Sequence, residues 1–255
     1  MRYYLVDAFT DTLFSGNPAG VCLVDRPLSP ELMQRIAGEN NLPETAFLEK
    51  GPAGWSIRWF TPAFEMDLCG HATLAAGFVL MNLIEPGDQA AFSSCSGPLR
   101  VLRRGYALDF PARPPREIPV PEGMEACLGE RVLGCWQSRD RIVLLESAEA
   151  VRRLQPDLER MAQVAPQWGL VPTAPGEDCD FVSRYFDPRD AVAEDPVTGS
   201  AHCTLAPFWA ARLGKETLTA RQLSRRGGTL RCTLQGDRVS IGGDAVLYLE
   251  GTLHI

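Results

Sequence analysis

Two glycine turns hold the residues of this sequence that are best suited to chemistry. Residues 67–73 and 194–201 each place ionisable or hydroxyl side chains around a glycine, directly before an apolar segment with helical spacing. The first N–H groups of a helix have no partner within the helix and carry the positive end of its dipole. They stabilise a carboxylate or a developing oxyanion, and glycine lets such a group approach the backbone closely. Helix capping by Thr198 or Ser200 would explain one turn. It does not explain why both turns carry polar residues at the mouth of an apolar helix.

Glu44 is the candidate base. It follows Pro43, which keeps Leu42 out of the helical region, so the sequence predicts a turn that enters a strand. Taken alone, Glu44 would be an ordinary surface glutamate. The internal repeat described below puts Leu170 at the corresponding place in the second half, so the acid occurs in one half only. This asymmetry suits a site with one principal base, which takes a proton from carbon while helix N-termini stabilise the negative charge.

The chain repeats itself once. Four short matches occur in the same order in both halves, and their offset grows only from 126 to 131 residues. Residues 28–32 resemble 154–158, residues 59–62 resemble 185–188, residues 69–72 resemble 198–201, and residues 97–100 resemble 228–231. We interpret the matches as a two-fold duplication, because ordered matches at a nearly constant offset are hard to attribute to chance.

Each half contains the same predicted elements: a strand, a helix, extended segments, an unusually apolar helix and a group of short strands. The apolar helices are predicted at residues 71–83 and 200–213, and a helix that is apolar on all sides is buried. Their core residues are predicted to be inaccessible to solvent, among them Leu74, Ala75, Phe78, Leu205 and Phe208. The predicted fold class is α+β, with two pseudo-symmetric lobes, each a curled antiparallel-rich sheet or barrel around a central buried helix.

Residues 111–121 contain five prolines, which predict an extended linker between the halves. The predicted lobes therefore cover residues 1–112 and 113–245.

Composition limits the partners and cofactors. The chain has 255 residues and a formal net charge of −7, without a basic stripe, which argues against nucleic acid and anionic membrane surfaces as partners. Its three histidines show no HxH or HExxH spacing, and no glycine-rich nucleotide loop is present, so we expect no metal and no cofactor. The eight cysteines form no CxxC pair, and the first residues show no long apolar stretch of the kind expected in a signal peptide. We interpret them as reduced, mostly structural thiols and expect a cytoplasmic protein.

Several motifs together resemble those of the PhzF family, the phenazine-biosynthesis isomerases and their relatives. These are Gly16-Asn17-Pro18-Ala19, Asn41-Leu42-Pro43-Glu44-Thr45-Ala46-Phe47, Phe60-Thr61-Pro62, Asp67-Leu68-Cys69-Gly70-His71-Ala72-Thr73 and Glu194-Asp195-Pro196-Val197-Thr198-Gly199-Ser200-Ala201. The resemblance runs from the first predicted strand to the last. It implies the diaminopimelate-epimerase-like fold, with the site in a cleft between the lobes and the final strand, residues 246–255, returning to the first lobe.

The resemblance also assigns roles. It implies a cofactor-independent isomerase that acts on a small acidic or enolisable molecule, as a homodimer. The catalytic residues carried over from the family are Glu44, His71, Asp195 and Ser200, and the residues expected to bind substrate are Asn17, Gly70 and Gly199.

Two other functions remain open. Relatives with this fold include epimerases and racemases that use one cysteine per lobe, each before the glycine of its turn. Here Cys69 precedes Gly70 but Thr198 precedes Gly199, and a threonine hydroxyl is no general base near neutral pH, which disfavours a two-thiol racemase. The second alternative is a binding protein that kept the fold without catalysis.

Overall fold

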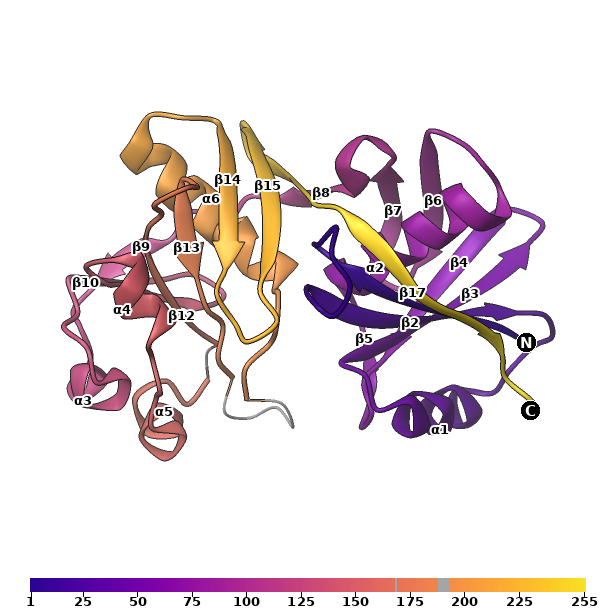
Figure 1. Ribbon diagram of the computed structural model, residues 1–255, viewed down its shortest axis with the longest axis horizontal. Coiled ribbons are helices and arrows are strands. Elements are labelled where there is room, and N and C mark those ends of the chain that lie inside the picture. Colours follow the sequence, from indigo (N-terminus) through magenta and orange to yellow (C-terminus); the bar gives the residue numbers. More distant parts are fainter. Residues whose placement is uncertain (168, 188–192) are drawn as a thin grey trace. The chain divides into compact units, whose positions relative to one another are not determined.

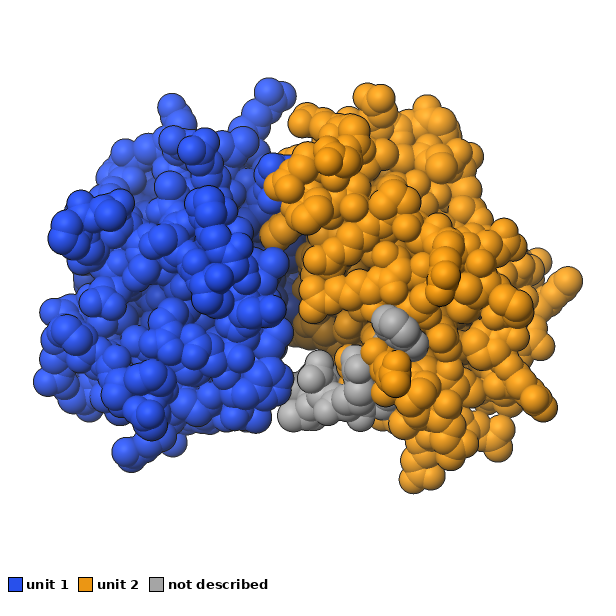
Figure 2. Space-filling model, turned by 180° about the vertical axis from the view of Figure 1, so that it is seen from behind, with its two compact units in different colours: residues 1–109, 242–255 blue, residues 110–241 orange. Residues whose placement is uncertain are grey.

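The computed structural model describes every residue except 168 and 188–192, and it has the α+β architecture (Figure 1). The chain divides into two compact units, Met1–Asp109 with Gly242–Ile255 and Phe110–Ile241, which are coloured separately in Figure 2.

The elements of the first unit are β1 (Arg2–Ala8), β2 (Asn17–Val24), α1 (Pro30–Asn40), β3 (Glu44–Gly51), β4 (Gly54–Phe60), β5 (Glu65–Met66), α2 (Gly70–Val79), the π-helical turn η1 (Leu80–Ile84), β6 (Gln89–Ser94), β7 (Gly97–Leu102), the 3₁₀ turn η2 (Arg104–Tyr106), β8 (Ala107–Pro111) and β17 (Ala245–Thr252). Those of the second are β9 (Arg116–Ile118), α3 (Met124–Leu128), β10 (Gly134–Gln137), β11 (Arg141–Leu144), α4 (Ala148–Arg152), α5 (Leu158–Val164), β12 (Leu170–Pro175), β13 (Phe181–Ser183), α6 (Gly199–Leu213), β14 (Thr217–Gln222), β15 (Gly228–Gln235) and β16 (Arg238–Gly242).

The two units pair their strands in the same pattern. In the first, the order β17-β1-β2-β3-β4-β6-β7-β8 is antiparallel except for the pairs β2/β3 and β4/β6, which are parallel. In the second, the order β9-β10-β11-β12-β13-β14-β15 is antiparallel except for β11/β12 and β13/β14. In each unit one parallel pair encloses the apolar helix, and the other encloses α1 in the first unit and α4 and α5 in the second. This pattern confirms the pseudo-symmetric α+β fold, although in the described part of the chain the sheets are open rather than closed into barrels.

The register of the strands matches the offset between the sequence repeats. Glu44 opens β3 and pairs with Ala19 of β2, and Leu170 opens β12 and pairs with Arg141 of β11. Glu44 and Leu170 are 126 positions apart, which is the offset of the first two sequence matches. One residue of the second match, Pro188, lies outside the described residues. The asymmetry between an acid and an apolar residue is therefore an asymmetry between equivalent places in the fold.

Helix α2 packs against β1, β2, β3, β6 and β7 of its own unit. It starts one residue before its predicted start and gives way to η1 at Leu80. Leu74 and Ala75 are inaccessible, as predicted. The prediction was wrong for Phe78, which is half-buried. It lies one residue before the end of α2, where the ring of Tyr106 covers part of it, with 5.5 Å between ring centroids.

Helix α6 packs against β14 and β15 and also begins at a glycine. Leu205 and Phe208 are buried, as predicted. An aromatic stack accompanies this helix: the Phe181 ring lies parallel to Trp209, and the imidazole of His202 also stacks on Phe181, with 5.8 Å between ring centroids.

A second layer of helices covers each sheet (Figure 1). Met33, Ile36 and Ala37 of α1 form a core with residues such as Phe47, and α3, α4 and α5 contribute to a larger core in the second unit. The proline-rich segment predicted as a linker is extended, but its residues Arg116–Ile118 also pair with β10 as an edge strand, a position that tolerates neighbouring prolines. Among the described residues, no helix has the length and apolar character needed to cross a membrane.

Candidate active site

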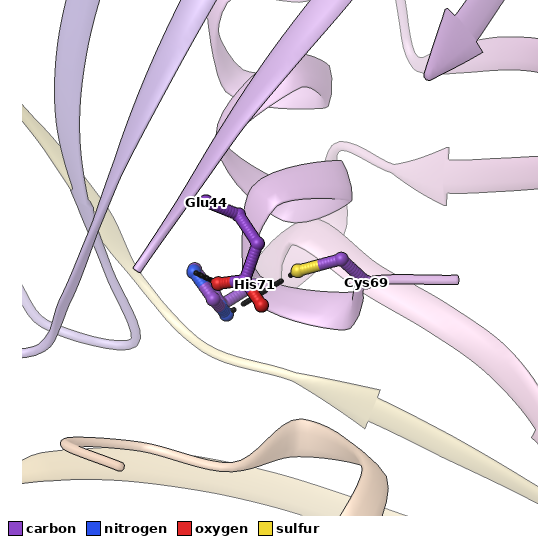
Figure 3. Close-up of side chains that lie close together, drawn as sticks. All are labelled: Glu44, Cys69 and His71. Atoms are coloured by element: carbon purple, nitrogen blue, oxygen red, sulfur yellow. Dashed lines mark hydrogen bonds and ion pairs between the residues drawn. The ribbon is translucent and has the colours of Figure 1, made fainter. Parts of the chain in front are cut away.

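Three of the predicted residues meet in the first unit because the elements that carry them begin at the same end of its sheet. Asn17 opens β2, Glu44 opens β3, and His71 is the second residue of α2. Gly16 makes the entry of Asn17 possible: its φ is +66°, and a Cβ there would lie 2.2 Å from the carbonyl oxygen of Ala8. Figure 3 shows Glu44, His71 and a further residue, Cys69, with their side chains directed toward one another.

The imidazole of His71 is the centre of this group and is 5% exposed. Its Nε2 lies 3.1 Å from Oε2 of Glu44, and its Nδ1 lies 3.3 Å from Nδ2 of Asn17 and 3.5 Å from Sγ of Cys69. Nε2 and the Glu44 carboxylate form a buried ion pair, and Nε2 has no hydrogen bond to any other described residue.

The charge on Glu44 decides the protonation of His71. Burial alone lowers the pKa of His71, but Cys69 and Glu44 raise it by more, so that it lies well above its usual value. The pKa of the Cys69 thiol is itself raised, first by burial and then by the negative charge of Glu44. Since a neutral thiol carries no charge, we attribute the raised pKa of His71 to the Glu44 carboxylate.

Asn17 can accommodate either protonation state of His71. Its amide N–H donates to Nδ1 when that nitrogen is unprotonated, and its oxygen accepts after rotation of the amide when the ring is charged. The Glu44–His71 pair can thus pass a proton between base and imidazole without breaking up the site.

The backbone at the start of α2 remains available for an anion. Cys69 is the N-cap residue, and its side chain makes no capping hydrogen bond. The hydroxyl of Thr73 donates instead to the carbonyl oxygen of Cys69, 2.5 Å away, and so does not compete for the first N–H groups. Gly70, the first residue of the helix, contributes no side chain that would shield them.

The second unit builds a different arrangement at the start of α6. Thr198 is the N-cap residue, but its hydroxyl donates to Oδ2 of Asp195, 2.6 Å away, and does not cap the helix. Gln222 of β14 fixes this turn: its Oε1 accepts from the N–H of Thr198 at 2.8 Å, and its Nε2 donates to the carbonyl oxygen of Asp195 at 2.7 Å. The capping explanation for the two turns is therefore wrong for Thr198. Gly199 and Ser200 are the first two residues of α6, and Ser200 is half-buried.

The structure therefore brings the predicted residues together in two groups. Glu44, His71, Asn17 and Gly70 lie together in the first unit, and Asp195, Gly199 and Ser200 lie around one turn of the second. That both groups serve one substrate stays a prediction.

Sequence reasoning misses two members of these groups. It considers Cys69 only as one thiol of the disfavoured two-thiol racemase and leaves it out of the predicted site, although the position of this residue directly before Gly70 and His71 is a signal. Gln222 comes from a strand more than twenty residues away from Thr198 and leaves no signal in the sequence.

One set of side chains could hold a metal ion. One potential ligand atom each from Glu44, Cys69 and His71 lies within 4.8 Å of the others. The sequence predicts no dedicated zinc site because the spacing lacks an HxH or HExxH pattern. A Cys-x-His pair completed by a distant glutamate escapes such a pattern.

Comparison with known proteins decides the family. The model of the PhzC-PhzF family, described as phenazine biosynthesis-like protein, matches residues 6–114 and 133–251. The chain belongs to this family. An uncharacterized isomerase of Pseudomonas aeruginosa is 51% identical, covering 100% of this chain and 99% of that protein. The crystal structure of a phenazine biosynthesis protein of the PhzF family from Enterococcus faecalis is similar with a TM-score of 0.97 and 44% identity, covering 100% of this chain and 99% of that one.

The fold extends beyond the PhzC-PhzF family. A hydroxyproline epimerase from Agrobacterium vitis is 12% identical, with a TM-score of 0.61 over 98% of this chain and 91% of that one, a likeness of fold alone. The resemblance stated from the motifs is thus confirmed at the level of family and fold.

Proposed function

We propose that this PhzC-PhzF family member is a cofactor-independent isomerase that moves a proton on a small acidic or enolisable metabolite, with Glu44 as the general base. The observation that carries the proposal is the buried Glu44–His71 pair at the open N-terminus of α2. The isomerase relative from Pseudomonas aeruginosa supports the reaction class.

The geometry supports a simple sequence of proton transfers. Glu44 takes a proton from a carbon atom of the substrate, and the charge that develops on the substrate is stabilised by the N–H groups at the start of α2. His71 holds a second proton 3.1 Å from the carboxylate, so a small side-chain rotation lets the two groups exchange protons before one returns to the substrate. Every step moves a proton only, and no oxidant or reductant is needed.

We further propose that Asp195 and Ser200 serve the same substrate from the second unit. Asp195 is held by Thr198 and Gln222, which suits a group that orients or protonates a substrate. The equivalent of Glu44 in this unit is the buried Leu170, so the second unit supplies no matching base. The proposed reaction is therefore a one-base proton shift rather than a two-base racemisation.

Exchange of substrate protons for deuterium tests the proposal even where the product of the reaction is unidentified. A library of small carboxylic acids and enolisable metabolites is incubated with the protein in heavy water and analysed by mass spectrometry. For any compound that the wild type labels, the rate should fall by roughly 10²–10⁴-fold or more in Glu44→Gln. Ser200→Ala should lose less, because it removes one hydroxyl and leaves the backbone donors in place.

Two results would count against Glu44 as the base. One is full exchange activity of Glu44→Gln on a compound that the wild type labels. The other is ligand-induced thermal stabilisation in the wild type and in Glu44→Gln without exchange of any compound, which would favour the binding-protein alternative. Glu49→Gln, an exposed carboxylate on the same strand, is the matched control and should retain full activity.

A further inference from the structure

We propose that Glu44, Cys69 and His71 form a binding site for Zn²⁺, and that occupation of this site shuts off the base. The site consists of one carboxylate, one thiol and one imidazole, which are three of the ligand types that zinc prefers. The inference concerns metal binding and stands apart from the proposed isomerase reaction. Only its inhibitory consequence rests on the proposed function.

The donors lie close enough together to be gathered around a single small ion. With zinc bonds of about 2.0–2.3 Å, tetrahedral ligands lie about 3.3–3.6 Å apart. The measured separations are 3.1 Å between Oε2 of Glu44 and Nε2 of His71, and 3.5 Å between Sγ of Cys69 and Nδ1 of His71; they involve different nitrogens of the ring, so they are not both ligand separations around one ion. One ion uses one ring nitrogen, and since ligand atoms of all three residues lie within 4.8 Å, small side-chain rotations bring them onto one centre.

The buried imidazole and the carboxylate already face each other at the same place. Nε2 of His71 lies within a nearly inaccessible side chain, and its contact there is the ion pair with Glu44, 3.1 Å away. A metal ion held between a neutral imidazole and the carboxylate would replace this ion pair. The side chain of Glu44 is 15% exposed, so the group is reachable from solvent on the carboxylate side.

The start of α2 and the start of β3 together supply three ligands. Cys69 and His71 flank Gly70 at the first turn of α2, and Glu44 reaches them from the start of β3 (Figure 3). Three protein ligands leave a fourth position for water or a substrate carboxylate. Binding releases the thiol proton of Cys69, and any proton on the coordinating nitrogen of His71, to the solvent. Bound zinc would hold Glu44 as a ligand and keep it from acting as a base.

Cobalt is the probe, because Co²⁺ replaces Zn²⁺ in such sites and gives a thiolate-to-metal charge-transfer band. We expect the tag-free full-length protein, kept reduced with a phosphine, to bind one equivalent of Co²⁺ with this band and with the intense visible bands of tetrahedral geometry. Zn²⁺ should displace the cobalt and remove both. The charge-transfer band should be absent in Cys69→Ser and retained in Cys95→Ser, the matched control for an exposed thiol of the same unit. Glu44→Gln and His71→Asn should weaken cobalt binding.

A second measurement uses unmodified protein, in case Cys69→Ser does not fold. Saturating Zn²⁺ should slow alkylation of Cys69 by iodoacetamide, followed by peptide mass spectrometry, and should leave alkylation of Cys95 unchanged. Absence of the cobalt band, or a band that survives in Cys69→Ser and is lost in Cys95→Ser, would overturn the proposal. So would equal protection of both thiols. A normal cobalt band in a protein that exchanges no substrate proton would contradict the proposed function and leave the metal site standing.

Discussion

At the scale of single residues, the two buried helices satisfy the carbonyl group of their N-cap residue with different side chains. The hydroxyl of Thr73 donates to the carbonyl oxygen of Cys69 in α2, and Nδ1 of His202 donates to that of Thr198 in α6, 2.8 Å away. Both donors lie four residues after the carbonyl, and they are equivalent positions of the repeat. The difference matters because His202 can titrate, whereas Thr73 cannot.

His202 should make the protein less stable in mild acid. Burial lowers its pKa from 6.5 to about 4 in the folded chain, and its Nε2 has no partner among the described residues. The unfolded chain therefore binds a proton first as the pH falls. The stability associated with neutral His202 is fully present above about pH 6.5 and is lost between pH 6.5 and 4, at up to about 1.4 kcal/mol per pH unit.

The substitution His202→Thr copies the arrangement of α2 and removes the titration. Between pH 7 and pH 5, urea unfolding should show a loss of stability about 2 kcal/mol larger for the wild type than for this variant. Comparing the change with pH in each protein cancels the cost of the smaller side chain. It also cancels His71, whose raised pKa acts in the opposite direction in both proteins. An equal loss in both would contradict the assignment, and the exposed His254→Gln should behave as wild type.

Sequence reasoning works differently for each residue of the site. Glu44, His71 and Asn17 could be found because they stand in motifs next to proline or glycine, whose backbone restrictions are local. The contribution of Cys69 depends on the direction of its side chain at the N-cap, and that of Gln222 on the pairing of distant strands. Neither is encoded in a short stretch of sequence.

At the scale of elements, close packing between α2 and β7 depends on a glycine inside the helix. A Cβ on Gly77 would lie 2.7 Å from Cβ of Val101, so the helix could not keep its present distance from the strand. Gly38 of α1 is also helical, but a Cβ there would meet only the carbonyl oxygen of Pro62, at 3.5 Å. Substitution by alanine therefore tests mainly packing at Gly77 and mainly helix propensity at Gly38.

Gly77→Ala should destabilise the protein by about 1–3 kcal/mol through overpacking. Gly38→Ala should be neutral or stabilise it by up to about 1 kcal/mol, because alanine favours the helix and the site has room. Chemical denaturation of both variants measures the two effects. If Gly77→Ala were as stable as Gly38→Ala, the helix would have to lie farther from β7 than described.

The positions of the two apolar helices and of the strands around them were predictable because the repeat fixes them twice, but the second unit carries the short helices α3, α4 and α5 where one helix was predicted. The π-helical end of α2 and the pairing of Arg116–Ile118 with β10 were not, since both depend on tertiary contacts that override local preference. The parallel pairs were also hidden, because a hydrophobic pattern does not reveal strand direction.

At the scale of the whole molecule, the first unit is made from both ends of the chain. Strand β17 pairs with β1 from Ala8 opposite Ala245 to Arg2 opposite Thr252. The N–H of Leu253 also donates to the carbonyl oxygen of Met1. The second unit is continuous in sequence, from Phe110 to Ile241.

Removal of residues 243–255 should therefore damage the two units unequally. Tyr4 and Val6, which are buried in the complete chain, lose a neighbouring strand. Hydrogen exchange followed by mass spectrometry should show lost protection in β1 and β2 and retained protection in β11 and β12. Removal of His254 and Ile255 alone is the control and should change little. Equal loss in both units would show that they do not unfold as separate units.

Dimerisation, which the family resemblance implies, stays a prediction that light scattering can decide.

The buried leucine that is equivalent to Glu44 in the second half limits how the activity of this chain can change. Leu170 is fully inaccessible and belongs to the core of the second unit, where it faces Phe186 across a backbone bridge. An acid introduced there would place an unpaired charge among apolar side chains, at a cost of several kcal/mol. A single substitution of Leu170 by an acid would therefore not give the second unit a usable base. Changes of specificity are therefore expected from substitutions around Glu44, and a designed two-base variant would need a redesigned core around residue 170 as well as the acid itself.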